Sequence, residues 1–209
     1  MLDIKAKKGY SKNMIKVVLF DADGVLLTGT MFSKYLQTSL GLNEDIIQEF
    51  FDNEFKKCLT GQSDIKDELP KYLKRWGWKK SIDDFLDLWF KSEYKMDDRL
   101  IRYVRTLRKK GINCSVATNQ EKNRAEYMQS QMGFNTLFNK IYASSHLGYM
   151  KSNRNFFAKV MQDLTSIQKE EILFWDNSVR NVLVAKRFGI NAEHYISFPD
   201  FQKKTEKYL

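Results

Sequence analysis

The sequence predicts an α/β fold, in which a parallel sheet has helices on both faces and one helical segment is inserted. Apolar runs of strand length occur before residue 30 and again after residue 93, where they alternate with helical stretches. Strands that are separated by helices pair in parallel. Residues 30–93 show helical periodicity alone. We therefore expect an α/β core domain formed by residues 1–29 and 94–209, and a helical subdomain formed by residues 30–93.

The composition is that of an ordinary globular protein. The chain has 209 residues, of which 43% are hydrophobic and 29% are charged, enough for one core with a small insertion. No apolar run approaches the length that spans a bilayer, so we expect no membrane partner. Residues 1–13 are basic and polar, which predicts a tail into the first strand rather than a secretory signal.

The few cysteines and histidines indicate the cellular compartment and bear on whether the protein binds zinc. Cys58 and Cys114 are the two cysteines, and buried thiols in a reducing cytoplasm explain them most simply. The expected location is therefore cytoplasmic. Two histidines without a Cys/His cluster argue against a zinc site.

The net charge is +9, but the basic residues are scattered along the chain. A solvated basic surface explains this pattern better than a nucleic-acid site, so nucleic acid is not an expected partner. The same positive field would draw a phosphorylated substrate towards the protein.

The first predicted strand ends in two acidic residues. Residues 17–20 form an apolar run typical of a strand buried on both faces, and Asp21, Asp23 and Gly24 follow it. Carboxylates are costly at the end of a buried strand unless they are paired or bind a cation. Open α/β sheets place their ligands at this end of their strands. An Asx turn that closes the strand is the alternative interpretation.

Four helices are expected in the inserted segment, each bounded by a capping residue or a glycine. They run from Met31 to Gly41, from the Asn43 cap to Gly61, from a cap at Ser63 or Asp64 through Leu73, and from Ser81 through Phe90. The many aromatic residues here favour core packing over a ligand site.

Strands and helices alternate after residue 97. The apolar stripe from Leu100 to Leu107 predicts a helix that ends at Gly111. Further strands are expected at 112–117, 137–143, 171–175 and 191–196, and further helices at 125–132, 156–164 and 179–188.

Polar residues of suitable chemistry follow the later strands or start the next helix. Thr118 and the Asn119 amide can hold a phosphate oxygen, although Thr-Asn also starts helices. Lys151 can neutralise a phosphoryl group, although a lone lysine is ordinarily solvated. Asp176 can bind a hard cation, although it can also cap a helix.

The sequence Asp21-Ala22-Asp23-Gly24-Val25 after an apolar strand resembles the first motif of the haloacid dehalogenase-like superfamily of hydrolases. Thr118, Lys151 and Asp176 follow in the order of its other motifs, and the resemblance covers about residues 15–196. It implies a Rossmann-like core with a helical cap between the first two motifs. The chain departs from the family pattern at Ser152, which replaces the usual proline.

The resemblance also implies roles for individual residues. Asp21 would be the nucleophile and Asp23 the general acid/base, with Lys151 as a third catalytic group. The residues implied in phosphate binding are Ala22 through its small size, Thr118, Asn119 and Lys151.

The metal implied is Mg²⁺, held by the Asp21 carboxylate, the Asp23 main-chain carbonyl and Asp176. Many relatives carry two adjacent acids at the last position, whereas this chain has Asn177 after Asp176. Asn177 can help only as a neutral ligand or as a hydrogen-bond partner, and Asn181 is expected to support the metal ligands.

The function implied is a Mg²⁺-dependent phosphatase that hydrolyses a small phosphorylated metabolite through an aspartyl-phosphate. Three segments resemble the sugar-phosphate, glucose-1-phosphate phosphatase-like branch: residues 61–64, residues 142–145 and the Asp-Asn-x-x-x-Asn-Val run from Asp176. A phosphomutase, a haloacid dehalogenase and a non-catalytic anion- or nucleic-acid-binding protein remain alternatives. Haloacid dehalogenases need neither the metal nor the second acid, so Asp23 favours phosphoryl chemistry.

Overall fold

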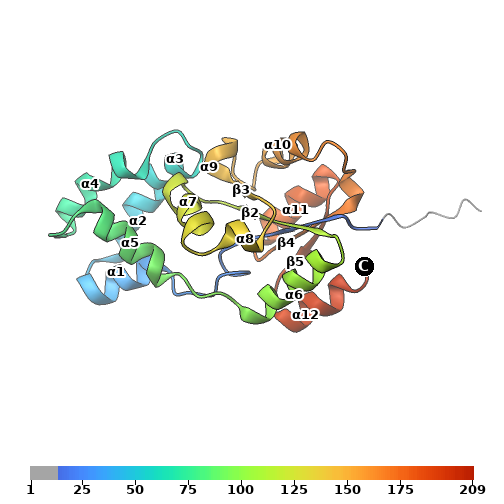
Figure 1. Cartoon of the computed structure of the whole chain (residues 1–209). Coiled ribbons are helices and arrows are strands. Elements are labelled where there is room, and N and C mark those ends of the chain that lie inside the picture. The colour runs from blue at the N-terminus through green and yellow to red at the C-terminus, as the bar shows by residue number, and fades with distance from the viewer. Residues whose placement is uncertain (1–13) are drawn as a thin grey trace, which may run out of the picture.

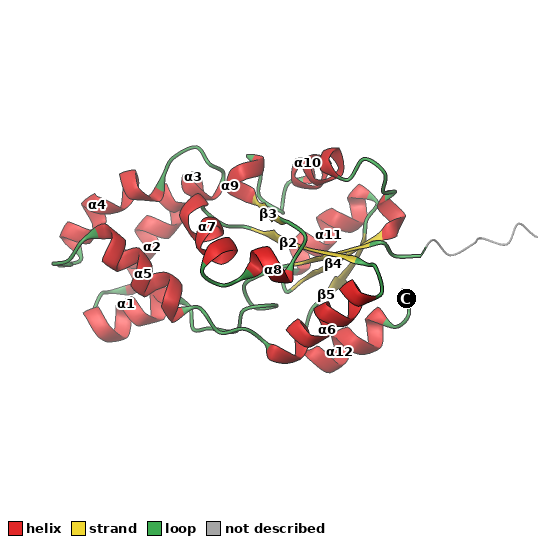
Figure 2. Cartoon of the chain, viewed as in Figure 1, coloured by secondary structure: helices red, strands yellow, loops and turns green. Residues whose placement is uncertain are grey.

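The computed structural model describes residues 14–209, and the expected tail at 1–13 lies outside the described residues. Its centre is a five-stranded parallel sheet with the strand order β3-β2-β1-β4-β5 (Figures 1 and 2). The strands are β1 (Val17–Phe20), β2 (Asn113–Thr118), β3 (Ile141–Ala143), β4 (Ile172–Asp176) and β5 (Asn191–His194). The predicted α/β fold with a parallel sheet is confirmed.

The register of the central strands brings their polar ends together. β1 lies between β2 and β4, with Phe20 opposite Val116 on one side and Trp175 on the other. Asp21 and Asp176 therefore follow directly opposed residues on adjacent strands. Because all strands are parallel, their carboxyl ends share one edge of the sheet, where ligands of such folds bind.

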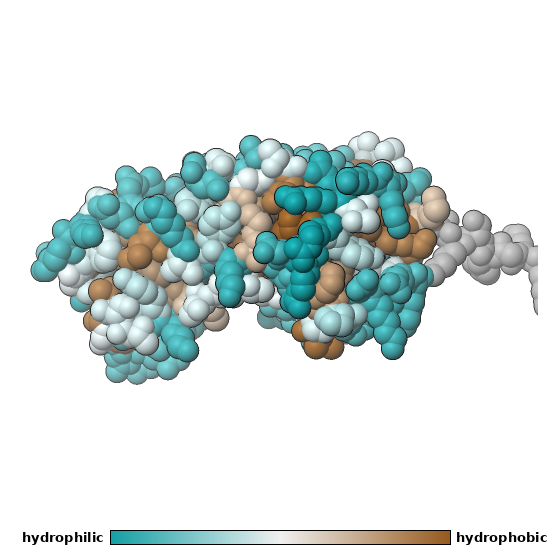
Figure 3. All heavy atoms as spheres, turned by 60° about the horizontal axis from the view of Figure 1, so that its bottom comes forward, coloured by the Kyte–Doolittle hydropathy of each residue, from teal (hydrophilic) through white to brown (hydrophobic). Residues whose placement is uncertain are grey.

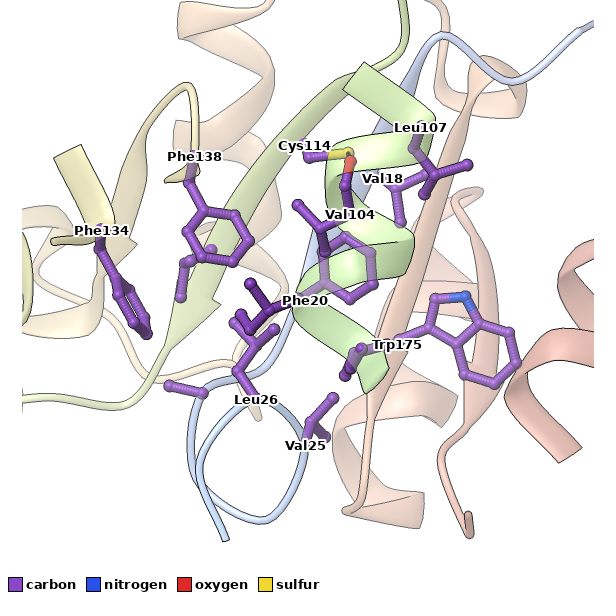
Figure 4. Close-up of a cluster of buried hydrophobic side chains, with 14 of the residues drawn as sticks. Val18, Phe20, Val25, Leu26, Val104, Leu107, Cys114, Phe134, Phe138 and Trp175 are labelled. Carbon is purple, nitrogen blue, oxygen red and sulfur yellow. Dashed lines mark hydrogen bonds between the residues drawn. The ribbon is translucent and has the colours of Figure 1, made fainter. Parts of the chain in front are cut away.

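Helices cover both faces of the sheet because successive side chains of a strand point to opposite sides. Val18 and Phe20 pack into one cluster, which Figure 4 shows between β1, Trp175 of β4 and the apolar side of α6. Val17 and Leu19 pack into the other. The helices that bury residues in the first cluster are α6 (Asp98–Lys109), α7 (Lys122–Ser130), α8 (Phe134–Leu137) and α12 (Phe198–Thr205). Those in the second are α10 (Arg154–Asp163) and α11 (Val179–Phe188).

Residues 32–92 form a separate helical unit beside the sheet (Figure 1). Its helices are α1 (Phe32–Leu40), α2 (Glu44–Asp52), α3 (Glu54–Leu59), α4 (Ile65–Arg75) and α5 (Ile82–Ser92). The unit has its own aromatic-rich core, separate from the two clusters on the sheet. On the face drawn in Figure 3, the surface narrows between this unit and the rest of the molecule.

Two linkers and one loop join the helical unit to the sheet. The linkers pair with each other through Thr28 N, which donates to Lys95 O over 2.7 Å. The loop after α3 contacts α9 (Ser144–Leu147), and a Cβ at Gly61 would overlap the Ser145 carbonyl. Gly61 also has a φ of +69°, so the close approach and the backbone both require glycine. Asn123 on α7 donates to Asp64 over 3.0 Å.

The prediction of a single helix between Asn43 and Gly61 is wrong, because the chain forms two helices, α2 and α3, with a break at Asn53. Asn53 has φ −109° and ψ −88°, and its side-chain amide donates to Glu49 O over 2.8 Å. Asn side chains compete in this way with the backbone hydrogen bonds of a helix. Of the predicted caps, Asn43 and Ser81 are confirmed, and Asp64 caps α4 in preference to Ser63.

Several other boundaries differ from the prediction. The strand expected at 137–143 is shorter than predicted and consists of β3 alone. The residues before it form the short helix α8, which starts after Gly133 in a left-handed conformation. The last strand ends at His194, and a helix that was not predicted, α12, follows the Ser197 cap. A four-residue helix, α9, follows β3 directly.

Cys58 and Cys114 are both buried and free, as expected. Within residues 14–209, no helix is long and apolar enough to cross a membrane.

Candidate active site

Lys151 lies between two carboxylates at the edge of the sheet. Its Nζ contacts Asp21 Oδ1 and lies 2.7 Å from Asp176 Oδ2. The three side chains are almost entirely buried. Burial alone would lower the pKa of Lys151, but Asp21 and Asp176 outweigh this and raise it. The lysine therefore stays charged in the buried cluster, unlike the solvated lysine of the alternative interpretation.

The buried cluster carries one negative charge too many, since two carboxylates face one ammonium. The pKa of Asp21 is raised to about 7, mainly by burial. The Lys151 charge opposes this rise, and the Asp176 charge adds to it. Without a further positive charge, a proton is the simplest way to neutralise this cluster.

Asp176 is fixed by the start of α11. Ser178 N donates to its Oδ1 over 2.7 Å, and Asn181 Nδ2 lies 3.2 Å and 3.1 Å from its two oxygens. The N-cap of α11 is Ser178, so the helix-capping interpretation of Asp176 is wrong. Its carboxylate instead contacts the Ser178 amide, Asn181 and Lys151. Asn181 thus holds Asp176 through its side-chain amide, which is the contact with a predicted metal ligand that was expected of it.

Asn119 positions the backbone of Lys151. Its Oδ1 accepts from Lys151 N over 2.9 Å, which connects the end of β2 with the loop before α10. Thr118 is 1% exposed and lies beside Asp21 in the same cavity. The Ala22 amide donates to Asp21 Oδ1 over 2.7 Å, and the Ala22 side chain is buried.

The Asp23 carboxylate contacts α7 and the loop that precedes it. It accepts from Arg124 of α7, over 2.8 Å to Nη2, and from the Gln120 side chain. Arg124 Nη1 also lies 2.8 Å from Glu93 Oε2 at the end of α5. No local pattern in the sequence marks Gln120, Arg124 or Glu93, so their contacts with Asp23 and with one another were not predicted.

Asn177 meets the turn after β1. Its Nδ2 donates to the Asp23 carbonyl over 3.2 Å, and a Cβ at Gly24 would overlap this amide. Gly24 has a φ of +78°, so glycine is required here on both grounds. His194 Nε2 lies 2.9 Å from the Asn177 carbonyl.

A polar cavity of about 350 Å³ opens over these groups. Its lining contains almost all of the predicted site residues: Asp21, Asp23, Thr118, Asn119, Lys151, Asn177 and Asn181. The remaining two predicted residues, Ala22 and Asp176, are buried next to it.

The donors at this cavity suit a hard divalent cation. Within the described part of the chain, no group of three or more His, Cys, Asp or Glu side chains is arranged to hold a metal. The predicted ligand set needs only two carboxylates, Asp21 and Asp176, together with the Asp23 carbonyl. Oxygen ligands and an excess negative charge are what Mg²⁺ binds. The residues present therefore fit the ion.

Comparison with known families agrees with this geometry. A family model described as haloacid dehalogenase-like hydrolase matches residues 15–189. The chain is a haloacid dehalogenase-like hydrolase. This assignment makes the protein an enzyme, so the non-catalytic alternative is no longer needed.

Solved structures share the fold of this hydrolase. A predicted HAD-like family hydrolase from Porphyromonas gingivalis superposes with a TM-score of 0.74 at 22% identity, covering 92% of this chain and 98% of that one. A HAD family enzyme from Bacteroides thetaiotaomicron, in complex with magnesium and inorganic phosphate, gives 0.77 at 18% identity, covering 91% and 98%. L-2-haloacid dehalogenase from Xanthobacter autotrophicus gives 0.64 at 18% identity, covering 93% and 83%. At these identities the likeness concerns the fold.

One curated relative matches part of the hydrolase. It is a drimenol cyclase from Aspergillus calidoustus, 28% identical over 106 residues. The match covers 49% of this chain and 20% of the relative, so the chain spans about a fifth of that protein's length.

Proposed function

We propose that this hydrolase is a Mg²⁺-dependent phosphatase, which cleaves a small phosphomonoester through an aspartyl-phosphate. The observation that carries the proposal is the position of Lys151 between Asp21 and Asp176, with Asp23 lining the same cavity. This arrangement offers a nucleophile, a charge that can neutralise a phosphoryl group and a second carboxylate for proton transfer.

In the proposed reaction, the Asp21 carboxylate attacks phosphorus while the bond from phosphorus to the leaving oxygen breaks. Asp23 gives a proton to that oxygen, so the alcohol leaves neutral. Asp23 then takes a proton from water as the water attacks the aspartyl-phosphate, which frees inorganic phosphate and Asp21. Thr118 and the Ala22 amide are proposed to bind the phosphoryl oxygens.

When bound, Mg²⁺ would supply positive charge that keeps Asp21 ionised and neutralises the phosphate. The proposed holders are the Asp21 and Asp176 carboxylates and the Asp23 carbonyl. The structural neighbour from Bacteroides thetaiotaomicron, crystallised with magnesium and inorganic phosphate, supports this ion and this substrate class. We further propose that residues 30–93 act as a cap over the site and that the enzyme works in the cytoplasm.

The proposal is tested by phosphate release from p-nitrophenyl phosphate with added Mg²⁺. Turnover is expected to stop on chelation and to return when Mg²⁺ is restored. Asp176→Ala should abolish the response to Mg²⁺, whereas Asp163→Ala, a carboxylate that pairs with Lys140 far from the cavity, should keep it. Release of chloride from 2-chloropropionate without metal would instead show a dehalogenase, and isomerisation of a sugar phosphate without net release would show a mutase.

A further inference from the structure

A second cavity, of about 590 Å³, adjoins the polar one and shares Asp23, Asn119 and Asn177 with it. It lies between the sheet edge and the helical unit. On the proposed function, a phosphate beside Asp21 extends its leaving group past Asp23 into this space. We call it the leaving-group chamber, and its chemistry therefore selects the alcohol that the enzyme releases.

The wall that the helical unit contributes is apolar. It is made by Phe51 of α2, Phe55 and Leu59 of α3, and Trp89 of α5. The rings of Phe51 and Phe55 lie 5.6 Å and 5.5 Å from that of Trp89, so they form one continuous aromatic surface. The break at Asn53 lies between the two phenylalanines and separates the helices that carry them.

The charged groups of the chamber are already paired. Arg124 is 5% exposed, and its guanidinium contacts the carboxylates of both Asp23 and Glu93. Among the described residues that line the chamber, one cation therefore faces two anions, and no positive charge is left over for a second phosphate or a carboxylate of the substrate. A leaving group that carries its own negative charge would be repelled here.

Hydroxyl groups would also lack partners on this wall. Apart from the buried indole N–H of Trp89, Glu93 gives the one polar group that the helical unit and its C-terminal linker contribute to the chamber. Its Oε1 accepts from Phe32 N over 2.8 Å, and its Oε2 faces Arg124. The polar lining residues Thr28, Asn119, Gln120 and Asn177 belong to the core domain. Hydroxyls that a sugar ring turns towards the helical unit would therefore lie against aromatic faces without hydrogen bonds, which is unfavourable.

We infer that the leaving group is an uncharged hydrocarbon alcohol with a ring-sized apolar part, rather than a sugar. This inference rests on the proposed phosphatase function and specifies its substrate class. Flat or cyclic hydrocarbon groups can bury their surface against Phe51, Phe55 and Trp89, and they have no polar groups that need hydrogen bonds. The sugar-phosphate branch that the sequence resembles is therefore not the substrate class that the chamber fits.

The test compares cyclohexylmethyl phosphate with glucose 6-phosphate at saturating Mg²⁺. Both are esters of a primary alcohol on a six-membered ring, and they differ in the ring hydroxyls and the ring oxygen. We expect kcat/KM to be at least tenfold higher for cyclohexylmethyl phosphate. An equal or higher value for glucose 6-phosphate overturns the inference while the phosphatase function stands. Absence of turnover of both esters and of p-nitrophenyl phosphate overturns the phosphatase function and this inference together.

Substitutions in the leaving-group chamber test whether its aromatic wall causes the preference for the hydrocarbon ester. Phe55→Asn should lower the ratio of the two kcat/KM values at least fivefold. Ile46→Asn, on the exposed side of α2, is the matched control and should leave this ratio unchanged. Because both substrates are measured on one sample, a loss of folded protein cancels in the ratio. An unchanged ratio in Phe55→Asn would contradict the inference even if the wild-type preference holds.

Discussion

The guanidinium of Arg124 binds the carboxylate of Asp23 at two points, with Nη2 2.8 Å from Oδ1 and Nη1 3.3 Å from Oδ2. The two residues are separated by 101 positions in the sequence. Arg124 also contacts Glu93, which accepts from the first backbone amide of α1. The proposed general acid is thus held by a residue that bridges the sheet and both ends of the helical unit.

Arg124→Lys should lower turnover of alkyl phosphates about tenfold or more, because one ammonium cannot fix the Asp23 carboxylate at two points. Turnover of p-nitrophenyl phosphate should fall less, since its leaving group needs little protonation. A purely structural role for Arg124 would reduce both rates equally. Arg105→Lys, on the exposed face of α6, is the control and should change neither rate.

Arg124→Gln should also destabilise the fold, because it leaves Glu93 buried without its cation. We expect a loss of about 3 kcal/mol in the free energy of unfolding, at the low end for a buried pair because half of the Asp23 side chain is exposed. Denaturant unfolding measures this loss. A change below about 0.5 kcal/mol, as is usual at the surface, would mean that Glu93 finds another partner.

Asp21→Asn should abolish turnover and, without metal, stabilise the fold at neutral and higher pH. The pKa of Asp21 is raised to about 7 by burial, so the folded state favours the protonated acid. The stability that this provides is present below the unfolded pKa of about 4 and is lost as the pH rises through the folded value. The variant keeps a neutral group, and Lys151 keeps Asp176 as its partner.

The measurement is the melting temperature of both proteins in chelator between pH 5 and pH 9. The advantage of Asp21→Asn should grow as the pH rises through about 7, because only the wild type then acquires the excess buried charge. A constant difference across this range would show that Asp21 does not titrate between pH 5 and pH 9. Near-normal turnover by the variant would contradict the whole proposed mechanism.

Asp23→Asn should reduce turnover in proportion to how much protonation the leaving group needs. The variant keeps Asp21 and the metal ligands but has no proton to give. We expect a loss of about 100-fold or more for cyclohexylmethyl phosphate and a much smaller loss for p-nitrophenyl phosphate. The rates are compared at one pH with saturating Mg²⁺. Equal losses on both esters would rule out the acid role.

Asp97→Ala should remove the cap of α6. The Asp97 carboxylate accepts from Arg99 N over 3.0 Å and from Arg99 Nη2 over 2.8 Å, and the hydrogen bond from the Arg99 side chain is the main cause of its lowered pKa. The loss should be about 1 kcal/mol near pH 7. Because the folded pKa is depressed, this stability exists above the unfolded value of about 4 and disappears as the pH falls through the folded one.

Chemical denaturation at pH 7 and pH 3 measures this cost. The difference between wild type and Asp97→Ala should shrink at the lower pH. Asp98→Ala, one residue further and exposed, is the matched control and should cost much less. An equal cost at both pH values would mean that the carboxylate charge of Asp97 contributes nothing.

The parallel sheet and the group of residues at its edge could be predicted from the order of residues along the chain. Asp21, Thr118 and Asp176 were found because each directly ends an apolar run, and parallel strands bring such ends to one edge. Lys151 was found from its place in a family motif. These signals are local, so the chain order alone carries them, and the roles of these residues stay predictions until the substitutions are made.

The surroundings of Asp23, in contrast, depend on how distant segments pack against each other. Gln120, Arg124 and Glu93 reach it only because α7 and the end of α5 dock beside the turn after β1. No periodicity or spacing records such a contact between distant segments. The aromatic wall is a second example: the sequence shows Phe51, Phe55 and Trp89 as core residues, and only the break at Asn53 and the packing of α5 turn them towards the site. Which side of a side chain faces a cavity depends on how helices pack, and that is settled by long-range contacts rather than by local sequence.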